Sequence, residues 1–244
     1  MGYTLFAPIP LLGRRAEVSH IDTLLTQPES RFVLVSGAVG MGKSKLLREC
    51  DSRAGRCGWM VAKGYEDEVL RVTHETNQVT FCRQLWCSLA ATSTSTAVKT
   101  PNISIQVDQV LDRINAFVKV LVLIDGFHVS PEFSPWFKDV FLAALKHCRA
   151  PVLTMVADIS AELTALETLA DEQINLGPLD RAEVREYFLA IKELVAPPLK
   201  ETEIETYVEQ GSPHPDLLAG LLRLLPLAAR SESVPAQECM RVKS

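Results

Sequence analysis

The amino-acid sequence predicts an α/β fold, in which a five-stranded, mainly parallel sheet lies between helices and is followed by a small all-helical lid. Apolar runs typical of strands alternate with helical patterns over residues 15–176, as in parallel sheets that helices cover on both faces. A glycine-rich loop joins the first strand to the next helix, and only helical patterns follow Pro178. At 244 residues, one large domain with a small lid is expected.

The elements of the first half follow from the spacing of apolar residues. The expected elements are, in chain order, helix 15–25, strand 32–36, helix 43–52, strand 59–62, helix 81–90 and helix 105–118. Residues 66–77 are polar and charged, which predicts a loop or a ragged edge. Residues 92–100 contain a run of small hydroxyl residues and are expected to form a surface loop.

The second half opens with residues 120–124, an uninterrupted apolar run typical of a central parallel strand. Helix 133–148, strand 151–157, helix 159–169 and strand 173–176 are expected to follow. Asp180, with Glu183 three residues later, predicts a capping box at the start of the lid. The lid helices are expected over 182–195, 201–210 and 215–227. We therefore expect a core over residues 1–178, a helical lid over 179–230 and a polar tail over 231–244.

The glycine-rich loop reads Gly-Ala-Val-Gly-Met-Gly-Lys-Ser from Gly37 to Ser44, directly after the apolar run 32–35. Glycines permit a positive φ and a close approach of the backbone to a ligand. Successive N–H groups then point at one spot, where the dipole of the following helix also favours negative charge. A glycine-rich turn with a stray lysine is the alternative, but the strand–loop–helix context favours a phosphate-binding loop.

This loop predicts a P-loop NTPase that binds a nucleoside triphosphate. Lys43 is expected to reach the β- and γ-phosphates, and the Ser44 hydroxyl to ligate Mg²⁺. The candidate nucleotide-binding residues of the loop are Gly37, Ala38, Val39, Gly40, Met41, Gly42, Lys43, Ser44 and Lys45.

Asp125 supplies the acidic residue that a magnesium–nucleotide site also needs, because it directly follows the apolar run 120–124. We expect it to hold the metal through water, as the corresponding aspartate does in phosphoryl-transfer sites. The alternative is an aspartate that only caps the end of a strand. Ser44 and Asp125 are therefore the candidate metal residues, and Lys43, Asp125 and His128 are the candidate catalytic residues.

The residue after Asp125 is Gly126, where fast ATPases of this type usually place a second carboxylate that orients the attacking water. His128 could act as a base instead, because a histidine titrates near neutral pH. A lone histidine at a strand end is more often a polar loop residue. We therefore expect nucleotide binding to be intact, and hydrolysis to be slow or completed by a partner.

Composition limits the partners. The net charge is −5 and no basic stripe is visible, so nucleic-acid binding is not expected. No apolar stretch approaches the roughly 18 residues of a membrane helix, and the short apolar start lacks a signal peptide's basic region.

The six cysteines include no Cys-x-x-Cys pair. Cys50, Cys82, Cys87 and Cys148 lie in apolar helical patterns, as expected for small buried side chains in a cytoplasmic protein.

Five ordered motifs resemble one ATPase group. They are Leu12-Gly13-Arg14-Arg15-Ala16-Glu17, the strand and loop over 32–49, Asp125-Gly-Phe-His128, Asn175-Leu-Gly-Pro-Leu-Asp180 and Gly211-Ser-Pro213. Together they resemble the STAND signal-transduction ATPases, a branch close to AAA+, and in particular the ATPase module of large LuxR-type bacterial regulators. The resemblance runs from about residue 11 to 225.

The resemblance implies a regulated switch that binds ATP or ADP with Mg²⁺ in the cleft between sheet and lid. It implies that Gly13 and Arg14 lie near the adenine or ribose edge, and that Pro178 and Pro213 belong to the nucleotide site. The 211–213 turn would close over the base. Nucleotide exchange would alter packing against a protein partner or a second copy of the chain, as in a homo-oligomer.

The sequence departs from this family at Gly126 and at Asp158, which stands where the family often has an arginine. No effector domain follows the lid, so we expect either a fragment or a small protein that works with partners in trans. Three functions remain open: a weakly hydrolysing switch, an AAA+-like ATPase that acts on DNA, and a hydrolysis-deficient scaffold. No guanine-reading Asn-Lys-x-Asp pattern occurs, which favours adenine.

Overall fold

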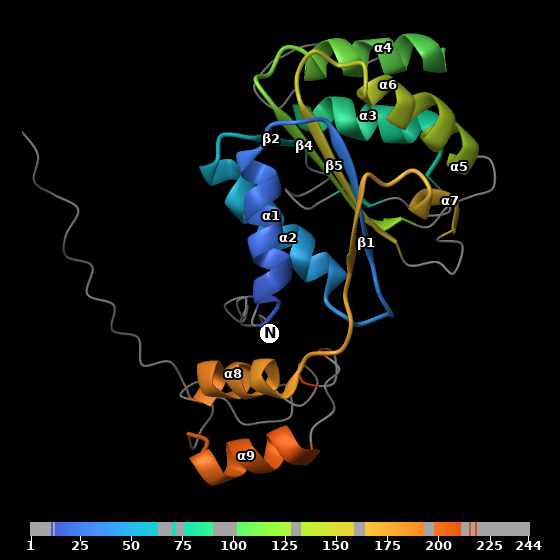
Figure 1. The fold of residues 1–244 in the computed structure, drawn as a ribbon. Coiled ribbons are helices and arrows are strands. Elements are labelled where there is room, and N and C mark those ends of the chain that lie inside the picture. The colour runs from blue at the N-terminus through green and yellow to red at the C-terminus, as the bar shows by residue number, and fades with distance from the viewer. Residues whose placement is uncertain are drawn as a thin grey trace, which may run out of the picture.

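The computed structural model describes residues 11, 13–62, 70–71, 76–89, 102–127, 133–158, 164–192, 198–210, 215 and 218. A parallel sheet forms the middle of the molecule, and helices lie against both of its faces (Figure 1). Two helices near the C-terminal end, α8 (Arg181–Ile191) and α9 (Glu201–Gln210), lie apart from the sheet. This arrangement confirms the predicted α/β fold class.

The sheet is parallel throughout, with strand order β2-β4-β5-β1-β6. The strands on this path are β1 (Arg31–Ser36), β2 (Met60–Ala62), β4 (Val120–Phe127), β5 (Val152–Asp158) and β6 (Glu172–Asn175). A further short strand, β3 (Leu70–Arg71), also pairs with β4. Because β2 pairs with residues 120–122 and β3 with residues 124–125, the two form one interrupted edge. The sheet is thus five strands wide, as predicted.

Strand β3 lies within the segment 66–77, which was expected to be a loop or a ragged edge. Its two residues pair with Ile124 and Asp125. The pairing depends on the neighbouring strand rather than on a local apolar pattern, so periodicity along the chain could not reveal it.

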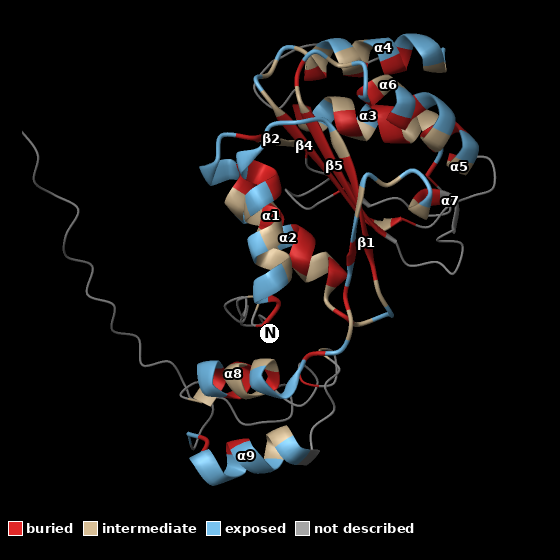
Figure 2. Ribbon diagram, viewed as in Figure 1, coloured by how far each residue is buried: buried red, intermediate tan, exposed pale blue. Residues whose placement is uncertain are grey.

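Alternate residues of each strand face opposite sides, and each side forms its own core. On one face, Phe32, Leu34, Val120, Val122 and Ile124 pack under helices α3 (Gln78–Leu89), α4 (Ile103–Ile114), α5 (Phe133–Trp136) and α6 (Ala143–Leu145). On the other face, Val33, Val35, Leu121 and Leu123 pack under α1 (Arg15–Thr26) and α2 (Lys43–Arg56). Figure 2 shows these buried strands between the two layers of helices. Strands buried on both faces explain the uninterrupted apolar runs of the sequence.

Aromatic side chains hold the carboxyl end of β4 in place. The predicted helix 133–148 is continuous over residues 133–145, with a π-helical section, η2 (Phe137–Leu142), in its middle. Phe133, Phe137 and Phe141 stack along it with centroid separations of 5.7 Å. Phe127, the last residue of β4, packs against Phe137 at 4.8 Å. The end of the strand that carries Asp125 is therefore anchored in the core.

A β-bulge occurs where β4 carries Asp125 and Gly126. Ile124 pairs with Val156, and the next pair is Phe127 with Asp158, so β4 has one extra residue at this point. Gly126 adopts a φ of 63°, the left-handed conformation common in bulges. The bulge reverses the alternation, and Phe127 therefore faces the same core as Val120, Val122 and Ile124.

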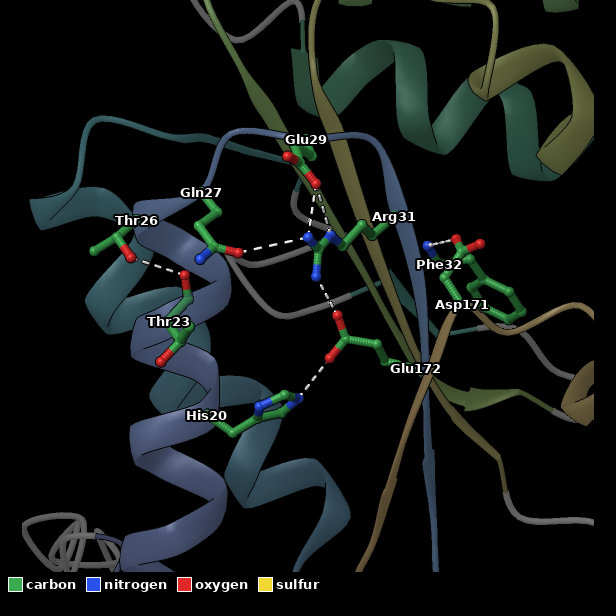
Figure 3. A network of polar contacts seen from close by, with 9 residues as sticks. All are labelled: His20, Thr23, Thr26, Gln27, Glu29, Arg31, Phe32, Asp171 and Glu172. Atoms are coloured by element: carbon green, nitrogen blue, oxygen red, sulfur yellow. Dashed lines mark hydrogen bonds and ion pairs between the residues drawn. The ribbon is translucent and has the colours of Figure 1, made fainter.

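The opposite end of the sheet is held by a polar network (Figure 3). Arg31, the first residue of β1, forms ion pairs with Glu172 of β6 and with Glu29. His20 of α1 contacts Glu172 with Nε2 2.7 Å from the carboxylate, and the Phe32 N–H donates to Asp171 at 2.8 Å. These contacts fix α1, β1 and β6 to one another at the end remote from the glycine-rich loop.

Helix boundaries differ from the predicted ones by a few residues, and capping explains two of them. Helix α4 begins at Ile103 because the Asn102 side chain accepts hydrogen bonds from the N–H groups of Ser104 and Ile105. Helix α8 begins after Asp180, and the predicted capping box with Glu183 is present. Of the predicted helix 159–169, the structure describes residues 164–169, and helix α7 (Thr164–Glu167) ends two residues before the predicted end.

Helices α8 and α9 form a separate small core, which we call the lid core: Leu179, Val184, Tyr187, Phe188, Ile191, Leu199, Ile204 and Leu218. Most of the predicted third lid helix and the tail 231–244 lie outside the described residues. No helix within the described part of the chain is long and apolar enough to cross a membrane.

Candidate functional site

The phosphate loop leaves the carboxyl end of β1 at Gly37 and leads into α2 at Lys43. Glycine is required at position 37, because a Cβ there would lie 2.5 Å from the carbonyl oxygen of Leu176, and φ is 140°. Gly40 and Gly42 also adopt positive φ angles, of 82° and 93°. The loop thus turns between a central strand and a helix N-terminus, where parallel sheets bind ligands.

Lys43 is held against the start of the loop. Its Nζ donates hydrogen bonds to the carbonyl oxygens of Gly37 at 2.6 Å and Ala38 at 3.0 Å. The residue is only 8% exposed. Because charge-assisted hydrogen bonds are strong, these contacts hold the ammonium within the loop.

Ser44 and Asp125 meet at the carboxyl edge of the sheet, although 81 residues separate them. The Ser44 hydroxyl donates to Oδ1 of Asp125 at 2.9 Å, and Asp125 is 4% exposed. Ser44 lies in the first turn of α2, which follows β1, and Asp125 lies on β4; β5 lies between these two strands. A hydroxyl and a carboxylate are the hard oxygen ligands that Mg²⁺ prefers, so the pair fits a magnesium ion.

Lys45 lies one residue further along α2 and is partly buried. Burial lowers the pKa of Lys45, because the low-dielectric surroundings disfavour the ammonium. No carboxylate of the described residues forms an ion pair with it. A partly desolvated cation at a helix N-terminus adds positive potential next to the loop, which an anionic ligand would relieve.

Arg14 is buried against the protein. Its guanidinium donates to the carbonyl oxygens of Met41 at 3.2 Å and of Gly177, and to the Glu17 carboxylate at 3.3 Å. Its backbone N–H donates to Oε1 of Glu183 at 2.7 Å. The resemblance implied a place near the adenine or ribose edge. The structure places the guanidinium between the phosphate loop and the segment that leads to the lid.

The remaining candidate residues lie around this centre or outside the described residues. Gly13 packs against the side chains of Leu179 and Glu183, where an added Cβ would meet atoms at 3.1–3.3 Å. Val39 is 70% exposed at the tip of the loop, Met41 is buried and Pro178 is exposed. His128 and Pro213 lie outside the described residues, as does the 211–213 turn.

Three residues form contacts with Arg14 that the sequence did not predict. The Glu183 side chain, expected only in the capping box, also accepts the Arg14 N–H. The carbonyl groups of Met41 and Gly177 receive the guanidinium. The capping-box pattern could point to Glu183, but backbone carbonyls leave no signal in a sequence.

The cysteines differ from one another in exposure. Cys50 and Cys82 are buried as expected, and burial raises the pKa of each thiol to about 12. Cys87 was also expected to be buried, but it is exposed, as is Cys57, because the helical face that carries Cys87 is turned to solvent. Among the described residues, no group of three or more His, Cys, Asp or Glu side chains could hold a metal ion.

Comparison with solved structures shows the same fold at low sequence identity. The Aeropyrum pernix ORC2 protein in ADPNP–ADP complexes matches with a TM-score of 0.61 and 15% identity, over 88% of this chain and 62% of that chain. Drosophila ORC bound to DNA matches with a TM-score of 0.57 and 15% identity, over 91% and 57%. AMPPCP-bound DnaA from Aquifex aeolicus matches with a TM-score of 0.53 and 12% identity, over 87% and 60%.

The chain therefore spans about three fifths of the length of each of these structures. No curated protein matches the sequence. A family model described as the AAA ATPase domain matches residues 10–234, which is nearly the whole chain. With its phosphate loop and its Ser44–Asp125 pair at the carboxyl edge of a parallel sheet, the chain belongs to the AAA ATPase domain family, whose members bind nucleotide.

Proposed function

We propose that the chain is a regulatory switch of the STAND/AAA+ type, which binds ATP or ADP with Mg²⁺, hydrolyses ATP slowly and controls assembly or a protein partner in signalling or defence. The observation that carries this proposal is that the residues expected to bind the nucleotide and Mg²⁺ are in place, whereas the position expected to carry a second carboxylate is a glycine. Lys43 and the Ser44–Asp125 pair are in place, whereas Gly126 follows Asp125.

Each side chain has a role in this proposal. Lys43 binds the β- and γ-phosphates, and the loop N–H groups at the start of α2 orient them. Ser44 and Asp125 hold Mg²⁺, which when bound would neutralise charge on the phosphate oxygens. Lys45, which follows Ser44 in the first turn of α2, adds positive potential beside the loop.

Slow hydrolysis follows from the residue after Asp125. Gly126 has no side chain to orient a water molecule, and general acid–base help is typically worth about 10²- to 10⁴-fold in rate. His128 remains a candidate base, but it lies outside the residues that the structure describes. A switch benefits from slow turnover, because each nucleotide state then persists long enough to alter packing.

A second candidate function is an ATPase that acts on DNA. The solved structures that share the fold include Drosophila ORC bound to DNA and AMPPCP-bound DnaA, at 12–15% identity. The net charge of −5 weighs against it. Binding to duplex DNA that weakens steeply with salt would favour this function over the switch, because released counterions give such a slope.

The test of the switch is nucleotide content and turnover of the purified chain, with its mass measured by light scattering in ADP and in ATP plus Mg²⁺. We expect bound ADP, slow turnover and a change of mass with ATP. Tight nucleotide binding without turnover and without a change of mass would favour a scaffold instead. Absence of nucleotide under every condition would contradict the proposal.

The matched variants are Lys43→Ala and Lys146→Ala. Lys43→Ala removes a charge-assisted contact to phosphate, which predicts a loss of affinity on the order of ten- to a hundredfold with the fold retained. Lys146 is a surface lysine that pairs with Asp171 near the start of β1, so its removal is expected to leave affinity unchanged. Equal affinities of the two variants would remove Lys43 from the site.

A further inference from the structure

The start of α1 joins three parts of the molecule that lie far apart in the sequence. The Arg14 guanidinium reaches Met41 in the phosphate loop and Gly177 after β6, and the Arg14 N–H reaches Glu183 on α8. Arg14 is 5% exposed, and its N–H groups donate to backbone carbonyl and carboxylate oxygens of these segments and of Glu17. A single buried residue thus touches both the loop that holds phosphate and the helix that begins the lid.

Glu183 completes the connection from the lid side. One carboxylate oxygen accepts the Arg14 N–H at 2.7 Å, and the other accepts the Asp180 N–H at 2.9 Å. The Glu183 N–H in turn donates to Asp180 at 2.8 Å. The same side chain therefore fixes the first turn of α8 and fastens that turn to Arg14.

The contact between Arg14 and Glu183 is tightly packed, and the Arg14 backbone is strained. A Cβ added at Gly13 would meet side-chain atoms of Leu179 and Glu183 at a tight 3.1–3.3 Å, and Gly13 has a φ of 70°. Arg14 has a φ of 60° and is the one non-glycine residue with a positive φ among those the structure describes. Such backbone strain persists only where the surroundings enforce it, and it often marks a working part of a site.

We propose that Arg14 and Glu183 are positioning residues that couple the conformation of the phosphate loop to the docking of α8. We call this pair the Arg14–Glu183 latch. The inference rests on the proposed nucleotide binding at the loop. It assigns the start of α1 a coupling role, since the guanidinium is engaged by protein carbonyl groups.

The coupling follows from the atoms involved. Met41 lies between Gly40 and Gly42, so any reorganisation of these loop residues around phosphate moves or fixes its carbonyl group. The guanidinium bound to that carbonyl carries the change to Gly177 and, through the Arg14 backbone, to Glu183. Coupling free energies are reciprocal, so a docked lid must raise nucleotide affinity by the same factor.

Three variants distinguish the effect of the latch from the effects of neighbouring contacts. Glu183→Ala removes both the latch and the capping box. Asp180→Ala removes the cap and leaves the Glu183 carboxylate available to the Arg14 N–H. Glu186→Ala removes the exposed Arg15–Glu186 ion pair, which lies one turn further along α8. Asp180→Ala and Glu186→Ala are therefore matched controls for loss of helix stability and for loss of a nearby charge.

The experiment is hydrogen exchange of the full chain, followed by mass spectrometry of peptides from α8 and from the phosphate loop, with and without MgADP. In the unaltered chain and in both controls, MgADP is expected to slow α8 exchange about fivefold or more. In Asp180→Ala, α8 is expected to exchange faster than in the unaltered chain when nucleotide is absent, but MgADP is expected to slow that exchange by the same factor. Glu183→Ala is expected to lose the difference, to bind MgADP about fivefold more weakly, and to exchange faster in the loop peptide without nucleotide.

A purely structural role of Glu183 would raise α8 exchange equally with and without MgADP. If Glu183→Ala keeps the same MgADP-dependent slowing as Asp180→Ala, the latch is overturned while the proposed function stands. If the unaltered chain binds no MgADP, both proposals are overturned. If it binds MgADP with no change in α8 exchange, the coupling alone is overturned.

Discussion

A glycine at position 126 serves the structure of β4, and it also affects the expected rate of hydrolysis. It is the left-handed residue of the bulge that turns Phe127 into the aromatic core beside Phe133 and Phe137. The sequence marked this position only as a missing acid. The structure shows that glycine there also lets β4 carry Asp125 to the site and still end in a packed side chain.

The Gly126→Asp variant tests whether the missing carboxylate limits hydrolysis. An L-residue at this φ costs about 1–2 kcal/mol, and asparagine and aspartate tolerate it best. Gly126→Asn is therefore the control, because it pays the same backbone strain without a charge. Single-turnover ATPase measurements are expected to show the Asp variant at least about tenfold faster than the Asn variant. Equal rates would mean that another step, or a partner, limits turnover.

Thiol reactivity provides a second test at the residue scale. Because burial raises the pKa of Cys50 and Cys82 to about 12, almost no thiolate exists at pH 8, and alkylation of the folded chain should be roughly a thousandfold slower than at exposed Cys57 and Cys87. Rates at each site can be followed by iodoacetamide labelling and peptide mass spectrometry. Rapid labelling of Cys50 under native conditions would contradict its buried place on α2.

The raised pKa values of Cys50 and Cys82 also determine how the stability of the folded chain changes with pH. The two buried thiols stay protonated in the folded chain, whereas in the unfolded chain they ionise near their ordinary value of 9.0. Their contribution to stability is therefore complete below about pH 9 and is lost as the pH rises from there towards about 12.

At the scale of elements, the strands and helices that carry the site could be predicted because their signals are local. The apolar runs of β1 and β4, the loop glycines and the capping box of α8 are each formed by residues that lie close together in the sequence. Ser44 and Asp125 were expected to cooperate because each follows a buried parallel strand. Their hydrogen bond at 2.9 Å agrees with that reasoning.

Other features depend on contacts between distant segments, and the sequence could not reveal them. Strand β3 is two residues long and exists through its pairing with β4. The π-helical section of the 133–145 helix gives no pattern distinct from an α-helix. Arg14 and Glu183 are 169 residues apart, and only the folded chain shows that a backbone N–H and a capping side chain meet.

At the scale of the whole molecule, the buried apolar side chains of the described residues form three cores of unequal size. The two cores of the sheet share strands, because alternate residues of β1, β4 and β5 belong to one or the other. The lid core has eight buried residues, drawn from α8, α9 and nearby segments. Among the described residues, the Arg14–Glu183 hydrogen bond and the exposed Arg15–Glu186 pair connect the lid to the rest of the protein.

This division predicts unequal local stability. Segments with few buried apolar contacts open at lower free energy than the main core, so amides of α8 and α9 are expected to exchange through openings about 2 kcal/mol or more below those of β4 and β5. Native-state hydrogen exchange of the nucleotide-free chain measures this difference. Helix α3 is the control, because it is also a helix but contributes Phe81, Cys82, Leu85 and Leu89 to a sheet core.

If α9 proved as protected as β4, core and lid would unfold as one unit, and nucleotide could not act by shifting a separate lid equilibrium. If α8 and α9 open first while α3 and β4 stay protected, the lid is the low-stability element that switching requires. Nucleotide bound at the loop would then act on an equilibrium that already exists in the free protein. A ligand can shift such an equilibrium only by its difference in affinity for the two states, and Arg14 is the contact through which the phosphate loop could sense which state the lid is in.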